Sequence, residues 1–162
     1  MTSDKAIAVD FSQETATSLI IAPPNLSSHQ ANWTGIYLQY HDCSTHETPE
    51  HYPTQHIIAI QTKGVVEAER KLGDRYKQEQ INTGDVCIVP AYTRHWIYTK
   101  GEQGLILLGI EPALLARSFS KELSSQVELL PHFARSDGLI HHLGLSLKTA
   151  LEINGFAVAI SS

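Results

Sequence analysis

The chain has 162 residues, of which 42% are hydrophobic and 18% are charged, and its formal net charge is −5. This length and composition predict one folded domain with a substantial core and exclude a disordered chain. Seventeen acidic residues against twelve lysines and arginines disfavour direct binding to nucleic acid, which needs clustered cations. No apolar run reaches the roughly 18 residues of a membrane span, and the first residues lack the pattern of a signal peptide. We therefore expect a cytoplasmic protein without membrane contact.

Short β-rich runs, each bounded by turn residues, fill the first two thirds of the chain. The expected strands span residues 6–11, 17–22, 33–40, 55–62, 65–71, 76–81, 85–89, 96–99 and 104–110. The turn Leu72-Gly73-Asp74 joins two of these runs as a hairpin. Because no helices alternate with the strands, the pattern predicts a mainly β fold, a barrel or sandwich, and not a parallel α/β sheet.

The last third of the chain predicts helices. Pro112 suits the opening turn of a helix, so we expect one from residue 112 to about residue 123. A second, short helix is expected over residues 127–134. The predicted parts of this single structural domain are a barrel at 1–111, a helical segment for packing or dimerisation at 112–155, and a tail at 156–162.

A third helix is expected after these two. Ser136 or Asp137 is predicted to cap its start, and Asn154-Gly155 supplies a signal for its end. Four leucines recur at every fourth position along it: Leu139, Leu143, Leu147 and Leu151. A stripe of this kind either packs on the barrel of its own chain or pairs with a second subunit.

The segment from residue 84 to 96 carries the most specific spacing in the sequence. Gly84 opens a turn before a strand, Pro90 ends that strand, and His95 begins the next one, facing inward. This spacing resembles the second motif of the cupin superfamily, in which glycine usually stands where this chain has Tyr92. The resemblance implies a double-stranded β-helix, or jelly-roll, barrel followed by C-terminal α-helices.

Residues 46–56 resemble the first cupin motif, except that this chain has Pro49 where the motif has its first histidine. By this resemblance His51, His56 and His95 present three imidazoles to one point. Such a set with an open position would suit a divalent transition metal such as Fe, Zn or Ni. In the other interpretation no cofactor is required, and His51 is a loop residue at the barrel mouth. His56 is then a hydrogen-bonded histidine at the start of a strand whose inward face continues with Ile58 and Ile60.

Several residues around His95 are candidates for ligand binding. Trp96 and Tyr92 would line an apolar pocket, although aromatic side chains are also common in strands as core residues. Arg94 either pairs with a carboxylate of the ligand or lies exposed in a loop. The candidate ligand-binding set is His51, His56, Tyr92, Arg94, His95 and Trp96.

The order of the segments carries a wider resemblance, over residues 33–151. The order of four segments resembles that in the N-terminal sensor domain of AraC-type transcription regulators. These segments are Pro49-Glu50-His51, Gln55-His56, the 84–96 motif and Glu111-Pro112. The resemblance implies a barrel that holds a small organic effector, helices that form a homodimer, and a role in transcription regulation. No helix-turn-helix pattern follows residue 150, so we expect either an isolated sensor domain that does not bind DNA by itself or a small stand-alone cupin.

Three interpretations of function therefore remain, one of which is a purely structural dimerisation module with no occupied barrel interior. The first is a non-catalytic, effector-sensing and dimerising domain. The alternative is a metal-dependent cupin enzyme, of dioxygenase or isomerase type, that uses the three histidines. A Gly-x-Ser-x-Gly motif and a glycine-rich phosphate loop are both absent from the sequence, which disfavours serine hydrolysis and phosphoryl transfer.

Overall fold

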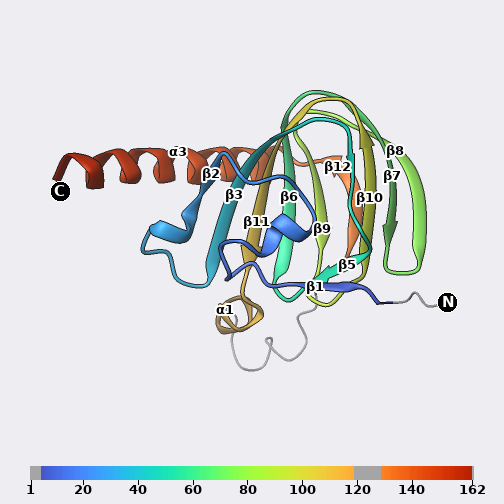
Figure 1. The fold of residues 1–162 in the computed structure, drawn as a ribbon, viewed down its shortest axis with the longest axis horizontal. Helices are drawn as coiled ribbons and strands as arrows, with labels where there is room; N and C mark the ends of the chain where they lie inside the picture. Colours follow the sequence, from blue (N-terminus) through green and yellow to red (C-terminus); the bar gives the residue numbers. More distant parts are fainter. Residues whose placement is uncertain (1–4, 119–128, 162) are drawn as a thin grey trace.

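A computed structural model describes residues 5–118 and 129–161 (Figure 1). Its elements are β1 (Ile7–Val9), the 3₁₀ helix η1 (Ala16–Leu19), β2 (Leu26–Ser27), the 3₁₀ helix η2 (Ser28–Gln30), β3 (Ile36–Cys43), β4 (His46–Glu47), β5 (His51–Pro53), β6 (His56–Lys63), β7 (Val66–Leu72), β8 (Arg75–Ile81), β9 (Asp85–Val89), β10 (His95–Lys100), β11 (Gln103–Ile110), α1 (Pro112–Arg117), β12 (His132–Ser136) and α3 (Gly138–Ser161). Among these residues, no helix is both long enough and apolar enough to cross a bilayer.

The strands form two six-stranded sheets that face each other. Sheet 1 has the order β1-β5-β10-β7-β8, with β4 beside β10, and sheet 2 has the order β12-β9-β6-β11-β3-β2. A hydrophobic core lies between them and draws side chains from both, including Val9 and Leu72 from sheet 1 and Val89 and Leu107 from sheet 2. This architecture confirms the predicted fold class, a β-barrel followed by helices.

Sheet 2 is buried on both faces because α3 packs on its outer side. In β6, Ile57, Ala59 and Gln61 face the barrel interior, whereas Ile58 and Ile60 pack in a second core with α3. A Cβ atom at Gly144 of α3 would lie 2.5 Å from Cδ1 of Ile60, so glycine permits this close approach of helix and sheet. Figure 1 shows α3 running across sheet 2 and continuing beyond its strands.

Two elements differ from the predicted ones. The strand expected at 17–22 is replaced by η1, where buried Thr17 donates a hydrogen bond to Oε1 of Gln39 at 2.8 Å. The helix expected at 127–134 is wrong in its described part, since β12 begins at His132 and pairs with the edge of β9. The segment 112–155 is therefore not wholly helical, and part of it completes the barrel. The first helix begins at Pro112 as predicted, and α1 ends at Arg117, before the expected end at about residue 123; residues 119–128 lie outside the described part.

The start of α3 is confirmed and its predicted end is wrong. Oδ1 of Asp137 accepts a hydrogen bond from the backbone N–H of Ile140 at 3.0 Å, as an N-cap does. The helix passes Asn154-Gly155 and ends at Ser161, so the predicted tail is mostly helix.

The leucine stripe divides between two environments. Leu139 and Leu143 are 72% and 54% exposed, whereas Leu147 and Leu151 pack on sheet 2. Four residues advance a helix by about 40° more than one full turn, so a stripe with this spacing winds around the helix. Only its later half therefore faces the barrel.

Candidate functional site

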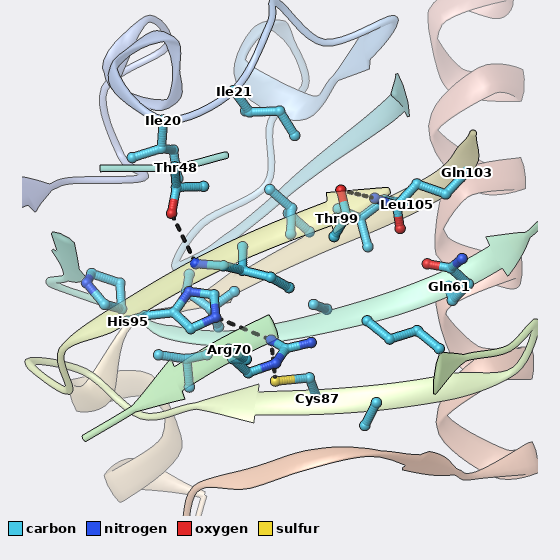
Figure 2. A pocket seen from close by; sticks show the side chains of 18 of the residues that line it. Ile20, Ile21, Thr48, Gln61, Arg70, Cys87, His95, Thr99, Gln103 and Leu105 are labelled. Atoms are coloured by element: carbon cyan, nitrogen blue, oxygen red, sulfur yellow. Dashed lines mark hydrogen bonds between the residues drawn. The ribbon is translucent and has the colours of Figure 1, made fainter. Parts of the chain in front are cut away.

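A cavity of about 90 Å³ lies between the two sheets (Figure 2). Most of its walls are apolar and include Ile57, Ala59 and Leu107 of sheet 2 and Ile97 of sheet 1. Ile20, which follows η1, covers it from the N-terminal segment, as Figure 2 shows. A few polar side chains interrupt this lining, and they determine what the cavity can bind.

Arg70 is the charged side chain at the centre of the site. It is 3% exposed and lies on the inward face of β7, which it shares with buried Ala68 and Leu72. Its Nη1 donates to Sγ of Cys87 at 2.9 Å and to Nε2 of His95 at 3.0 Å. Figure 2 shows the guanidinium inside the cavity beside both residues.

Glu79 neutralises this buried cation. Its Oε2 accepts a hydrogen bond from Nε of Arg70 at 2.6 Å, and both side chains are at most 5% exposed. The other carboxylate oxygen, Oε1, accepts from the backbone N–H of Ala134 at 3.0 Å. The ion pair therefore connects sheet 1 with β12, the strand that leads into α3.

The Arg70 contact sets the protonation of two histidines. A guanidinium only donates hydrogen bonds, so Nε2 of His95 accepts, and the ring proton of a neutral His95 lies on Nδ1. Nδ1 faces Nε2 of His51 at 3.4 Å, and Nδ1 of His51 donates to the carbonyl oxygen of Pro49 at 2.9 Å. Burial lowers the pKa of both rings, and for His95 the charges of Arg70 and His51 lower it further. Both shifts favour the neutral form of the imidazole.

A second polar group lies away from Arg70. Gln61 of β6 is buried, and its Nε2 donates to the carbonyl oxygen of Gly64 at 3.2 Å. Nearby on the lining, Nε2 of Gln103 donates to Oγ1 of Thr99 at 3.3 Å. Figure 2 shows these side chains projecting into the same space as Arg70.

The three predicted metal-binding histidines do not converge. His51 and His95 meet, with ring centroids 5.1 Å apart, but His56 lies outside the cavity lining. Nδ1 of His56 accepts a hydrogen bond from the backbone N–H of Ala91 at 3.0 Å, which is the hydrogen-bonded role of the second interpretation. That interpretation also needs a correction: Ile58 and Ile60 face α3, not the barrel interior.

The residues present do not fit a transition metal. No group of three His, Cys, Asp or Glu side chains suited to a metal occurs among the described residues. The Nε2 atom of His95 is engaged by the Arg70 guanidinium, whose positive charge would also repel a cation there. The proposed site of Fe, Zn or Ni at His51, His56 and His95 is therefore not assembled.

Besides His56, three of the predicted ligand-binding residues lie away from the cavity. Trp96 points to the outer face of β10, where its Nε1 donates to Oε2 of Glu47 at 2.9 Å. Arg94 lies with Nη1 3.8 Å from Oε1 of Glu50 at the surface. Tyr92 is 68% exposed in the loop before β10. The alternation of side chains along β10 explains this result, because His95 faces inward and its neighbour Trp96 must face outward.

Arg70 and Gln61 were missed as site residues. The 63–75 segment has many charges of both signs and indicates a solvated hairpin. One signal was nevertheless present: Arg70 follows Val66 and Ala68 at alternate positions, which places it on the apolar face of a strand.

No family model and no curated protein matches this chain. Among solved structures, it is similar to a cupin superfamily protein from Desulfitobacterium hafniense, with 22% identity, a TM-score of 0.44, and coverage of 59% of this chain and 86% of that one. It is also similar to a cupin-2 domain protein from Shewanella frigidimarina, with 13% identity, a TM-score of 0.43, and coverage of 56% of this chain and 82% of that one. A third similar structure is oxalate decarboxylase from Bacillus subtilis, with 14% identity, a TM-score of 0.44, and coverage of 60% of this chain and 25% of that one. The likeness is one of fold alone.

Proposed function

We propose that this chain is a sensor domain that binds a small molecule inside its barrel without a metal, in the manner of AraC-type regulators. The observation that carries the proposal is the buried Arg70, which is held by Glu79, Cys87 and His95 in a mainly apolar cavity. An arrangement of a few fixed polar groups on apolar walls is typical of small-molecule sites. The metal-enzyme alternative has no comparable support, because its ligand set is not assembled.

A route from the cavity to α3 supports the sensing role. Glu79 binds Arg70 on one side and the backbone of Ala134 on the other. Three residues after Ala134, Asp137 caps the first turn of α3. A ligand that changes the position of Arg70 would therefore act on the strand that holds the start of this helix, provided that it binds the two arrangements with different affinity.

The exposed half of the leucine stripe supports pairing of two subunits through α3. Leu139 and Leu143 are large apolar side chains on the solvent-facing side of the first turns of the helix. The resemblance to AraC-type sensor domains, whose helices after the barrel dimerise, favours a second copy of this chain as the partner. The chain itself would not contact DNA.

Sedimentation velocity on the full chain tests this association. We expect the wild type to sediment as a dimer and the Leu139→Glu/Leu143→Glu variant as a monomer. Leu130→Glu is the matched control, since Leu130 is also an exposed leucine, at 66%, but lies outside α3. A wild-type monomer at all concentrations, or a dimer unaffected by the double substitution, would contradict the proposed role of the helix.

A further inference from the structure

We infer that the cavity takes a small uncharged molecule that offers a hydrogen-bond acceptor to Arg70 and a hydrogen-bond donor to Gln61. This inference rests on the proposed function, because it names the chemical class of ligand for the same cavity. Four features carry it: an unpartnered oxygen, the free donors of the guanidinium, the balance of charges, and the size of the space.

Gln61 supplies the unpartnered oxygen. The hydrogen bond from its Nε2 to the carbonyl of Gly64 fixes the orientation of the amide, so Oε1 faces away from that bond. The side chain is 1% exposed, and Oε1 has no hydrogen-bond partner among the residues that the structure describes. A buried acceptor of this kind is costly to leave unpaired. A hydroxyl or amide N–H of a ligand would satisfy it.

Arg70 presents the opposite chemistry from the facing sheet. A guanidinium has five N–H donors, and the hydrogen bonds to Glu79, Cys87 and His95 use its Nε and Nη1 groups. Within the described part of the chain, Nη2 makes no such bond. Its two N–H groups are therefore available to an acceptor on a ligand, such as the oxygen of a carbonyl or an amide.

The charges around the cavity disfavour an ionised ligand. Glu79 already neutralises Arg70 from behind the lining, and Asp85 is a carboxylate of the lining itself. Burial lowers the pKa of His51 and His95, so neither ring compensates for the excess of negative charge. An anion would be desolvated beside two carboxylates and one guanidinium, and a cation would meet the donors of Arg70. An uncharged molecule avoids both costs.

The cavity is also small. Its volume of about 90 Å³ is well below the roughly 300–1,000 Å³ of sites for drug-sized ligands. The apolar side chains of the lining, among them Ala59 and Leu105, suit a short carbon skeleton. A three-carbon hydroxy-amide has the required donor, acceptor and size.

Three probes that share a three-carbon skeleton and a hydroxyl group test the inference: lactamide is neutral, lactate is an anion, and 1-aminopropan-2-ol is a cation at neutral pH. Binding to the full chain is measured by NMR titration of isotope-labelled protein. We expect lactamide to produce saturable shifts at Gln61, Cys87 and Leu105, and the two charged probes to bind at least tenfold more weakly.

Two variants connect the binding to Gln61. In Gln61→Leu the unpartnered oxygen is removed, so we expect a raised unfolding midpoint together with at least tenfold weaker lactamide binding. A residue with a purely structural role would not separate stability from binding in this way. Gln80→Leu, on the exposed side of β8, is the matched control and leaves lactamide binding unchanged.

The outcomes distinguish the inference from the proposed function. Tighter binding of lactate or of the amino-alcohol at the same resonances would overturn the ligand class and leave a ligand-binding barrel standing. Saturable shifts for none of the probes, or equal lactamide binding by Gln61→Leu, would overturn the inference directly. The proposed function is tested separately by sedimentation velocity. That experiment measures the association of subunits and needs no ligand.

Discussion

Nη1 of Arg70 lies 3.0 Å from Nε2 of His95, and the other ring nitrogen of His95 faces Nε2 of His51 at 3.4 Å. The guanidinium is a fixed cation, and Glu79 holds it there through a hydrogen bond of 2.6 Å. The positive charge that a metal ion would bring is thus provided by a side chain.

The wild-type protein is expected to retain no stoichiometric transition metal after incubation with Fe(II), Zn or Ni followed by desalting. The reason is that His56 faces away from His51 and His95, and Arg70 repels a cation from the remaining pair. Plasma mass spectrometry measures the metal content, with His95→Ala run in parallel. One metal per chain that is lost in His95→Ala would show that the histidines do bind metal.

The Arg70–Glu79 pair is expected to be strongly coupled. Arg70→Met leaves the Glu79 carboxylate buried without its cation, and we expect it to lower the free energy of unfolding by about 3–5 kcal/mol. Arg70→Met/Glu79→Gln removes the charge and keeps an acceptor for Ala134, so it should recover a large part of the loss. Urea denaturation of the wild type, both single variants and the double variant measures the coupling. Additive effects of the two substitutions would contradict it.

Acid is expected to destabilise the fold through His41. Burial lowers the pKa of His41 from 6.5 to about 4, so between these values the unfolded chain binds a proton that the folded chain does not. The free energy of unfolding should therefore fall with decreasing pH, by about 1.4 kcal/mol per pH unit for this residue. The lowered pKa values of His51 and His95 act in the same direction.

His41→Phe isolates this contribution. We expect the pH slope of its unfolding free energy to be shallower than that of the wild type below pH 6.5, the ordinary pKa of histidine, and the two curves to run parallel at higher pH. Denaturant titrations across the range provide the slopes. Identical slopes below this value would mean that His41 takes up a proton in the folded state.

Tyr92 is expected to store backbone strain. Its φ of +66° lies in the left-handed region, which costs a residue with a side chain about 1–2 kcal/mol relative to glycine. The backbone N–H of Tyr92 donates to the carbonyl oxygen of Pro53 at 2.7 Å, and this bond helps to hold the conformation. Thermal unfolding of two variants separates the contributions: Tyr92→Gly should be more stable than Tyr92→Ala by about 1 kcal/mol. Equal stability would rule out strain at this position.

The two halves of the leucine stripe should respond differently to truncation. Leu151 is buried against sheet 2, so Leu151→Ala is expected to cost about 2–5 kcal/mol. Leu139→Ala, at an exposed position of the same helix, should change stability by no more than about 0.5 kcal/mol in the monomer. Urea denaturation at low protein concentration makes the comparison. A large loss at Leu139 would indicate that this residue packs within its own subunit.

Most strands of the barrel were predictable from the sequence. Which side chains of a strand point into the barrel was harder to predict. In β7 the alternation of Val66 and Ala68 with charged residues reveals one inward face. In β6 both faces are apolar, because Ile57 contacts the barrel core and Ile60 contacts α3. Where both faces are buried, period-two alternation disappears, and the orientation of His56 at the start of this strand could not be read.

The elements that sequence reasoning missed depend on distant partners. β12 is a strand because His132 and Arg135 find the open edge of β9, which no local pattern reveals. η1 forms where the buried Thr17 meets Gln39, a residue 22 positions away along the chain. Likewise, the cavity charges were hidden, because Glu79 pairs with Arg70 across a hairpin whose other charges are solvated.

Under the proposed function, coupling from Arg70 through Glu79 and Ala134 to α3 would act in both directions. If occupation of the cavity changes how firmly α3 associates with a second subunit, then association must change the affinity of the cavity by the same factor. Ligand affinity would thus depend on protein concentration. A titration in dilute solution and one in concentrated solution would give different dissociation constants for the same molecule.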